Sequence, residues 1–275
     1  MRPGRPAFLA RARGPALALP LRPLDLVGSK LILDLDSRYV SLGIGTKIGQ
    51  WRDQSSYGHH GIQGTLLNQP AHQLPVAGLT FDGKPAVRFT NITNTTYFDG
   101  AIAPGLLNVG DTPYLYVVTR TWQTGGYSHP AFGLISISAD GTAATEIRLG
   151  KTTGYSMSMN GTDYVASISP NNSFYYAWPM EMMGRFAAAK MHLELSWFQL
   201  PSTHHPNPWN ANVDAPTGLL NALTQFTVGR SFAGIGGRMD VFRILVVNPA
   251  PTPEQHIAIR NCLRREYPSF IATAS

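Results

Sequence analysis

Short apolar runs, many of them alternating with polar residues, recur along the chain from residue 28 onward. The alternation is clearest in "LISIS" (134–138) and "MHLELSWFQL" (191–200). A period of two predicts strands that bury one face and expose the other. Glycine, proline, asparagine or aspartate bounds nearly all of these runs. Because no long amphipathic helix lies between them, we expect an all-β fold, with antiparallel strands in a two-sheet sandwich.

One helix is predicted, over residues 252–267 in "PTPEQHIAIRNCLRREY". Thr252 is a natural N-cap, and Pro253 suits the first helical position because its missing N–H has no partner there in any case. The apolar positions Ile259, Leu263 and Tyr267 fall on one stripe. We therefore expect this helix to cover one edge or end of the sandwich.

Residues 1–27 lack the alternating pattern and are rich in proline and arginine. Proline stands at positions 3, 6, 15, 20 and 23, a spacing that favours extended or polyproline chain over helix. We predict an extended arm over residues 1–27 and a single domain over residues 28–275. Five arginines of the arm precede the first acidic residue and suit an acidic partner surface: Arg2, Arg5, Arg11, Arg13 and Arg22.

Charge and composition limit the function classes. The net charge is +6, and the residues that precede Asp25 supply five of these charges. The body is therefore close to neutral, and the high pI does not indicate that it binds nucleic acid. The single cysteine, Cys262, excludes an internal disulfide, and its place in the predicted helix indicates a structural thiol. No run reaches the roughly 18 apolar residues of a membrane span.

The order of these segments resembles a known family. "KLILDLDS" (30–37) is followed by W-x-D-x-S-x-x-G (51–58), then "GLTFDGKPAVRF" (78–89), and a late strand leads directly into the capped helix. This order is similar to the laminin-G-like, concanavalin A-like jelly-roll domains of bacterial and phage proteins, over residues 28 to 267. The chain departs from that pattern at Ser56, where the family has glycine, and at His59-His60. The resemblance implies a jelly-roll sandwich.

The segment "GQWRDQSSYGHHGIQG" (49–64) has two interpretations. Two imidazoles beside Asp53 could form a reactive or metal site. Asp53 and Ser55 are also turn formers that bond nearby backbone amides, and neighbouring histidines on an extended chain point in different directions. We favour the structural turn.

Signs of catalysis are weak. Glycosidases need two carboxylates at a set separation, and no strand carries an E-x-D-x-E pattern. Asp34 and Asp36 match a structural motif of the family. Glu194 is expected on the solvent-exposed face of its strand. Neither a P-loop nor an H-E-x-x-H or G-x-S-x-G motif occurs. We expect no enzyme activity and no cofactor.

A glycan site is the sharpest candidate. The Pro-rich segment 201–218, interpreted as a loop, combines an aromatic face with amides and a carboxylate, the groups that sugar sites use. Its candidate residues are His205, Trp209, Asn210, Asn212 and Asp214, and Trp122 is a further exposed aromatic candidate. Asn212 and Asp214 could also hold a weakly bound calcium ion, although the carboxylate count is low. The plain alternative is an ordered loop that packs on the domain or on a partner.

These features favour a non-enzymatic structural protein: a phage virion component, as a capsid decoration or fibre-associated subunit. The arm would anchor it to protein subunits of a large assembly, and the body would contact neither nucleic acid nor membrane. The alternatives are a lectin-type module that binds surface glycans and, behind it, a glycoside hydrolase. The apolar stretch "PALALPL" (15–21) is too short and proline-broken for a secretory signal. We therefore expect synthesis in the host cytoplasm and localisation in the virion, with an extracellular location as the alternative.

Overall fold

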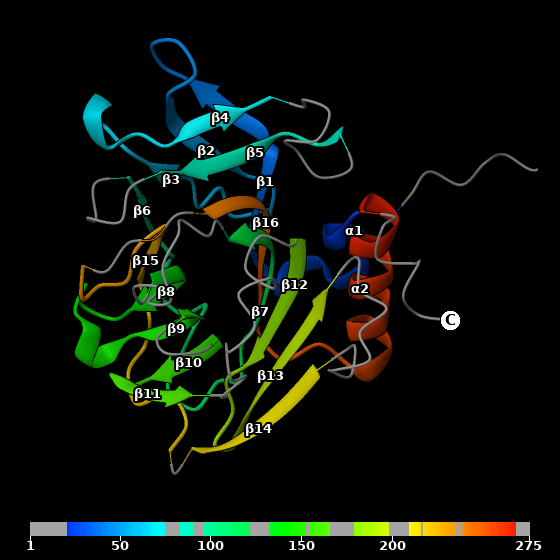
Figure 1. Cartoon of the computed structure of the whole chain (residues 1–275). Coiled ribbons are helices and arrows are strands. Elements are labelled where there is room, and N and C mark those ends of the chain that lie inside the picture. The colour runs from blue at the N-terminus through cyan, green and yellow to red at the C-terminus, as the bar shows by residue number, and fades with distance from the viewer. Residues whose placement is uncertain are drawn as a thin grey trace, which may run out of the picture.

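The computed structural model describes residues 21–74, 83–90, 96–121, 132–151, 155–165, 179–197, 209–215, 217–234, 237 and 239–267. Within these ranges the chain is mostly antiparallel β-sheet with two short α-helices (Figure 1). The all-β prediction and the predicted C-terminal helix are confirmed.

The elements have the following bounds. The helices are α1 (Pro23–Val27) and α2 (Pro253–Glu266), with 3₁₀ turns η1 (Gly28–Lys30), η2 (Leu66–Asn68) and η4 (Ala143–Thr145). The strands are β1 (Leu31–Leu42), β2 (Ile48–Asp53), β3 (Gly61–Ile62), β4 (Ala71–Gln73), β5 (Ala86–Phe89), β6 (Phe98–Ala101), β7 (Tyr114–Thr121), β8 (Phe132–Ser138), β9 (Ile147–Lys151), β10 (Tyr155–Met159), β11 (Thr162–Val165), β12 (Pro179–Arg185), β13 (Ala189–Trp197), β14 (Trp209–Ala215), β15 (Gln225–Val228) and β16 (Met239–Val247).

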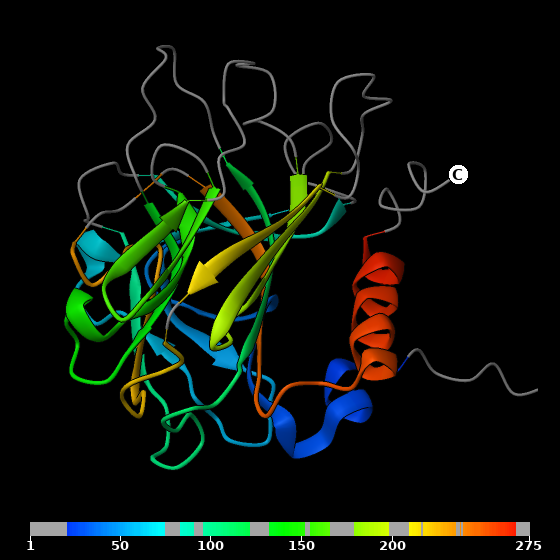
Figure 2. The same cartoon turned by 90° about the horizontal axis from the view of Figure 1, so that it is seen from below.

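Hydrogen bonds join the described strands into one continuous path. Its order is β11-β10-β9-β8-β15-β6-β3-β2-β1-β16-β7-β12-β13-β14, with β4 and β5 attached beside β16. The sequence predicts a two-sheet sandwich. In the structure the short strands β15, β6 and β3 join β8–β11 to β2, β1 and the strands beyond them in one hydrogen-bonded path, so the division into two sheets stays a prediction. Strands β8–β11 and β12–β14 face each other in Figure 2.

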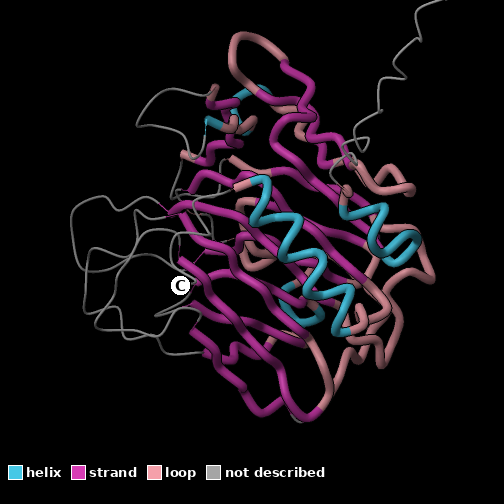
Figure 3. Tube along the Cα trace, turned by 90° about the vertical axis from the view of Figure 1, so that its right-hand side faces the viewer, coloured by secondary structure: helices cyan, strands magenta, loops and turns pink. Residues whose placement is uncertain are grey.

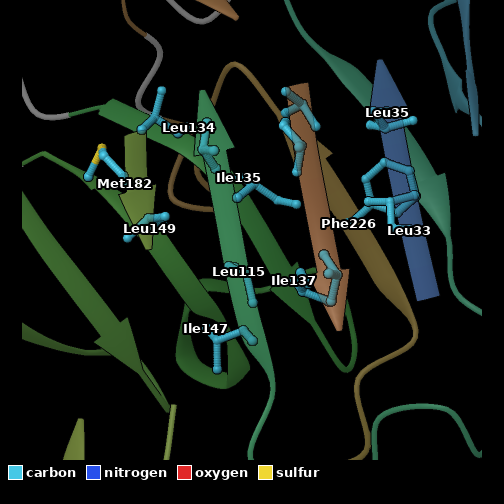
Figure 4. Packing of buried hydrophobic residues seen from close by; sticks show 14 of the residues in the cluster. Leu33, Leu35, Leu115, Leu134, Ile135, Ile137, Ile147, Leu149, Met182 and Phe226 are labelled. Atoms are coloured by element: carbon cyan, nitrogen blue, oxygen red, sulfur yellow. The ribbon is translucent and has the colours of Figure 1, made fainter. Parts of the chain in front are cut away.

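The path folds back on itself around a hydrophobic interior. A Cβ at Gly184 on β12 would lie 3.2 Å from the Met157 Cε on β10 and 3.3 Å from the Leu149 Cδ1 on β9. Strands that are far apart in the path therefore touch across the core, and only a glycine allows this spacing without displacing a neighbour. Figure 4 shows the packed side chains of this interior, including Leu115, Ile135 and Leu149.

A second hydrophobic cluster lies on the outer face of the sheet, beneath α2. The helix crosses this face in Figure 3 and buries Ile259, Leu263 and Tyr267 against apolar residues of β7, β12 and β16. The predicted stripe is thus confirmed. The predicted N-cap is confirmed as well, because the Thr252 side chain accepts from the Gln255 N–H at 3.2 Å and the Gln255 Oε1 accepts from the Thr252 N–H at 3.1 Å.

Thr252→Ala will lower the free energy of unfolding by about 1 kcal/mol, since it removes one half of this reciprocal cap. Thermal unfolding followed by circular dichroism measures the effect. Thr46→Ala, at an exposed threonine of the β1–β2 connection, is the control and should stay within about 0.5 kcal/mol of the parent. Equal losses in the two variants would contradict the role of the cap.

The arm departs from the prediction in the part that the structure describes. Residues 23–27 form α1 rather than extended chain, so the extended arm over 1–27 is wrong for this stretch. Pro23 occupies the first helical position, where it has no N–H to leave unpaired, and the Arg22 N–H donates to the Asp25 carboxylate at 2.9 Å. The arginines at positions 2, 5, 11 and 13 lie outside the described residues.

This root of the arm is attached to its own domain. The Gln255 amide donates to the Leu26 carbonyl at 3.3 Å, and the Cys262 thiol donates to the Leu21 carbonyl at 3.1 Å. Both donors belong to α2. Residues 21–27 therefore dock on the protein's own helix, and the sequence prediction that the arm lies across a neighbour can apply only before Leu21.

Candidate functional site

The Trp51–Gly61 segment is a structural turn, as the sequence indicates. The buried Asp53 carboxylate accepts from the backbone N–H groups of Asp34 (2.7 Å), Ser55 (2.9 Å) and His59 (2.8 Å), and also from the Ser55 hydroxyl (2.5 Å). A carboxylate that accepts four bonds from its own turn holds the chain in place and has little capacity left to bind a substrate.

Both histidines of this segment are also engaged in the fold. The His59 Nδ1 lies 3.0 Å from the Ile32 carbonyl, and its Nε2 accepts from the Ala103 N–H at 3.0 Å. The His60 Nδ1 accepts from the Asp53 N–H at 3.0 Å. The two rings point to different partners, so they do not form a paired imidazole site.

Asp34 and Asp36 likewise serve the structure. Arg243 of β16 donates to both oxygens of Asp34, at 2.9 and 2.8 Å, and also pairs with Glu266 at the end of α2. Arg38 bridges Asp36 and the same glutamate. A groove of about 660 Å³ lies beside this network, between α1, β1 and the end of α2. All three acids beside it are neutralised by arginine, so the groove offers no free carboxylate from this network.

Glu194 differs from the prediction. Its side chain does not face solvent: it is 8% exposed beneath α2, where Arg260 pairs with it and with Glu181 of β12. The same guanidinium donates to the Ser196 hydroxyl at 2.9 Å. The alternation of β13 correctly predicts which side chains share a face, but α2 covers that face. Burial raises the pKa of Glu181 above its ordinary value, against the opposing effect of Arg260.

Next to α2, the same outer face carries a row of polar and aromatic side chains that remains accessible. Arg185 of β12 pairs directly with Tyr114 of β7 on one side and with His192 of β13 on the other. His192 in turn pairs with Asn212 of β14. Because directly paired residues of antiparallel strands project from the same face, these four side chains form one line across four strands, here called the Tyr114–Asn212 row.

The row is partly exposed and partly preorganised. Tyr114, Arg185 and His192 are half-buried, and Asn212 is exposed. The His192 Nδ1 lies 2.9 Å from the Asn212 Oδ1, so Nδ1 donates to this oxygen and Nε2 of the neutral ring is left as an acceptor. The Asn212 amide group keeps its two donor hydrogens. This set offers a phenol, a guanidinium, an imidazole and an amide side by side, a combination that can bind hydroxyl and carboxylate groups.

His256 on the first turns of α2 borders the row. Its ring centroid lies 5.9 Å from that of Tyr114 and 5.8 Å from that of Tyr116. The Tyr116 hydroxyl and the His256 Nδ1 are 2.8 Å apart. Burial and the charge of Arg260 lower the pKa of His256 below its ordinary value, whereas burial raises the pKa of Tyr116. The tyrosine thus keeps its proton and donates it to a neutral imidazole.

This contact predicts a pH dependence. Because the His256 pKa is lower in the folded state, the unfolded chain binds more protons below about pH 6.5, and unfolding becomes more favourable as the pH falls. Urea unfolding between pH 7 and pH 5 should show this slope, and the His256→Gln variant should show a shallower one. A proton NMR titration should place the His256 pKa below 6.5, and a value above it would contradict the neutral acceptor.

The structure brings together only part of the predicted glycan site. Residues 209–215 form the strand β14 and not a loop, so the loop interpretation of the whole 201–218 segment is wrong there. The alternation of Asn210, Asn212 and Asp214 was the signal for this strand, and it places Asn212 and Asp214 on the face of the row. Asn212 and Asp214 are exposed on that face. The side chains of Trp209 and Asn210, and the residues Trp122 and His205, lie outside the described part of the chain.

The sequence did not single out Tyr114, Arg185, His192 or His256 as binding residues. Arg185 and His192 face each other in the β12–β13 hairpin, but Tyr114 and His256 come from elements distant in sequence, and only the strand order and the docking of α2 bring them to this hairpin. Among the described residues, no group of three or more histidine, cysteine, aspartate or glutamate side chains is placed to hold a metal ion. The calcium site at Asn212 and Asp214 stays a prediction. No helix of the described chain has the length and apolar character needed to cross a bilayer.

Comparison with known proteins gives a fold but no family. No model of a protein family matches the chain, and no curated protein does. Among solved structures, an arabinofuranosidase complexed with arabinofuranosyl-α-1,2-xylobiose matches with a TM-score of 0.57 and 11% identity, over 90% of this chain and 65% of that one. A GH54 α-L-arabinofuranosidase mutant soaked with 4-nitrophenyl α-L-arabinofuranoside matches with a TM-score of 0.59 and 10% identity, over 90% and 66% of the two chains.

A bacterial toxin domain shows the same likeness. The binding domain of botulinum neurotoxin DC in complex with SialylT has a TM-score of 0.50 and 10% identity, and covers 86% of this chain and 52% of its own. The protein therefore spans less than two thirds of the length of these neighbours. At such identities the likeness shows an all-β sandwich fold of this kind and nothing finer.

Proposed function

We propose that the protein is a non-catalytic binding protein whose body is a concanavalin A-like jelly roll that binds carbohydrate on the outer face of β12–β14. The observation that carries this proposal is the Tyr114–Asn212 row. It presents an aromatic ring, hydrogen-bond donors and an acceptor in one line, beside the exposed Asp214 carboxylate. Such a set can stack against a sugar ring and bind its hydroxyl groups.

The comparisons support this choice only through their fold. All three neighbours described above were obtained with a sugar compound, namely 4-nitrophenyl α-L-arabinofuranoside, arabinofuranosyl-α-1,2-xylobiose and SialylT. The fold of this chain thus occurs in proteins that bind sugars, and the row gives this chain a surface suited to that use. The sequence favours the virion component over the lectin-type module, but the described contacts support the lectin-type module better.

The arrangement of acids does not favour a hydrolase. Glycosidases of the usual kind work with two carboxylates about 5–10 Å apart on either side of the scissile bond. Glu181 and Glu194 are the acids closest to the row on β12 and β13, and both are neutralised by Arg260 beneath α2. A buried, arginine-bound glutamate is not free to attack a substrate or to protonate a leaving group.

A glycan array followed by calorimetric titration of the best ligands tests the proposal. The parent protein should bind at least one oligosaccharide, and His192→Ala and Asn212→Ala should each weaken that binding about tenfold or more. Asn261→Ala, an exposed asparagine on the solvent side of α2, is the matched control and should bind as the parent does. Binding that survives both substitutions would refute the site.

The root of the arm favours a second candidate, the virion component. The hydrogen bonds from Gln255 and Cys262 hold the Leu26 and Leu21 carbonyls on α2. A partner that binds residues 1–20 would therefore be connected through this contact to α2 and to the sheet beneath it. We propose that these residues attach the protein to a larger assembly of subunits. Deleting residues 2–20 should abolish association with particles while the melting temperature of the body stays unchanged. Full incorporation of the shortened chain would contradict the anchoring role.

A further inference from the structure

Arg185 occupies an unusual position for an arginine in this protein. Arginines of the described chain that are as buried as Arg185 mostly pair with acids, as Arg148 does with Glu146 and Arg260 does with Glu181. Arg185 is half-buried at the end of β12, yet within the described residues no hydrogen bond or ion pair joins its guanidinium to another side chain. A partly exposed cation without an acidic partner is open to an anion supplied from outside, and charge-assisted hydrogen bonds to such an anion are strong ones.

The neighbouring acids do not supply that anion. Glu194 stands on β13 two residues from His192, but Arg260 holds it under α2. Asp214 lies opposite Lys190, two residues beyond Asn212 on the same face, and forms no ion pair with another described residue. Of the acidic groups near Arg185, Glu194 is therefore paired with Arg260, and Asp214 lies two residues beyond the Tyr114–Asn212 row. The positive charge of Arg185 has no acidic partner within this row.

The groups beside Arg185 define what such an anion would be attached to. Neighbouring strands lie about 4.8 Å apart, so the four members of the row extend over roughly 14 Å, which is longer than one sugar ring. A planar guanidinium matches a carboxylate with two parallel hydrogen bonds. The Tyr114 phenol lies on one side of this cation, and the His192 Nε2 and the Asn212 amide lie on the other, at distances where the hydroxyl groups of the same ligand could reach them.

We infer that the row binds an acidic saccharide, with the sugar carboxylate on Arg185 and its hydroxyl groups on His192 and Asn212. This inference rests on the proposed carbohydrate-binding function and specifies its ligand class. The preference for acidic over neutral sugars comes from one residue, whereas binding as such comes from the rest of the row. The two can therefore be separated by experiment.

Calorimetric titration of the full chain with two matched pairs of probes tests the inference. The first pair is trigalacturonate and its methyl ester, and the second is sialyllactose and lactose. In at least one pair we expect the acidic sugar to bind about tenfold or more tightly than its neutral partner, as charged hydrogen bonds would give. Arg185→Gln should remove this preference, and Arg185→Lys should retain part of it.

The control is Arg52→Gln, at an exposed arginine on β2, which should keep the full preference. Thermal unfolding of each variant verifies that the fold is intact. Equal affinity of the parent for both members of each pair would overturn the acidic ligand while leaving carbohydrate binding in place. A preference that survives Arg185→Gln would also overturn it. Absence of binding to all four probes and to the glycan array would instead refute the proposed function itself.

Discussion

Replacing Arg243 with methionine will lower the free energy of unfolding by about 3–5 kcal/mol, the range expected when one partner of a buried ion pair is removed. The guanidinium is 4% exposed and lies between Asp34, Asp36 and Glu266. Burial alone would lower its pKa, but these three carboxylates raise it well above the ordinary value. Without Arg243, Asp34 remains buried as an uncompensated charge. Chemical unfolding at pH 7 measures the loss.

The pH dependence of the variant tests this explanation. Burial already raises the pKa of Asp34, and Arg243 opposes that rise. Without the arginine the folded-state pKa rises further above the unfolded one, so the carboxyl group takes up a proton more readily in the folded protein. The deficit of the variant relative to the parent should therefore shrink as the pH falls toward 5. Arg22→Gln, which breaks an exposed pair with Asp25, should leave the free energy of unfolding nearly unchanged, because solvent screens exposed pairs. A constant deficit across this pH range would contradict the buried-charge explanation.

Asp53→Ala will also destabilise the fold strongly, by about 3 kcal/mol or more. The substitution removes the acceptor of three backbone N–H groups, from Asp34, Ser55 and His59. An unsatisfied buried donor costs about 1–3 kcal/mol, and partial access of water to this turn will reduce the sum. Thermal and urea unfolding measure the change.

Asp53→Asn is the informative control. It keeps the shape and one carbonyl oxygen, but it replaces the acceptor of the His59 N–H or of the Asp34 N–H with a donor group. Its loss should therefore fall between the parent and Asp53→Ala. If Asp53→Ala left stability unchanged and altered only ligand binding, the segment would be a site and not a turn, and our interpretation would be wrong.

Local signals predicted the elements that depend on local interactions. The cap of α2 is contained in four consecutive residues, from Thr252 to Gln255, and the alternation in "MHLELSW" assigns the two faces of β13 correctly. What the pattern could not show is which face meets solvent. The Glu194 side chain belongs to the polar set of its strand, but a helix some sixty residues later in the chain covers it and supplies Arg260 as its partner.

The candidate site could not be predicted from local sequence patterns either, because its residues meet only through the pairing of strands. Arg185 and Tyr114 become neighbours only because β12 pairs with β7, and this pairing joins segments about seventy residues apart in the sequence. A lone arginine at the end of a strand gives no sign that it lacks a partner. The residues of β14 were singled out for their composition, and their alternation then agreed with the register that aligns Asn212 with His192.

The Cys262 thiol allows the docking of residues 21–27 on α2 to be measured chemically, because it donates to the Leu21 carbonyl. It is the sole cysteine of the chain, it is 3% exposed, and burial raises its pKa. Its reactivity toward a maleimide or a disulfide reagent should thus be slow while Leu21 lies over it, and fast once that segment lifts away. The rate of thiol labelling would therefore measure how often the Leu21 segment of the arm detaches from α2, and no added probe is needed.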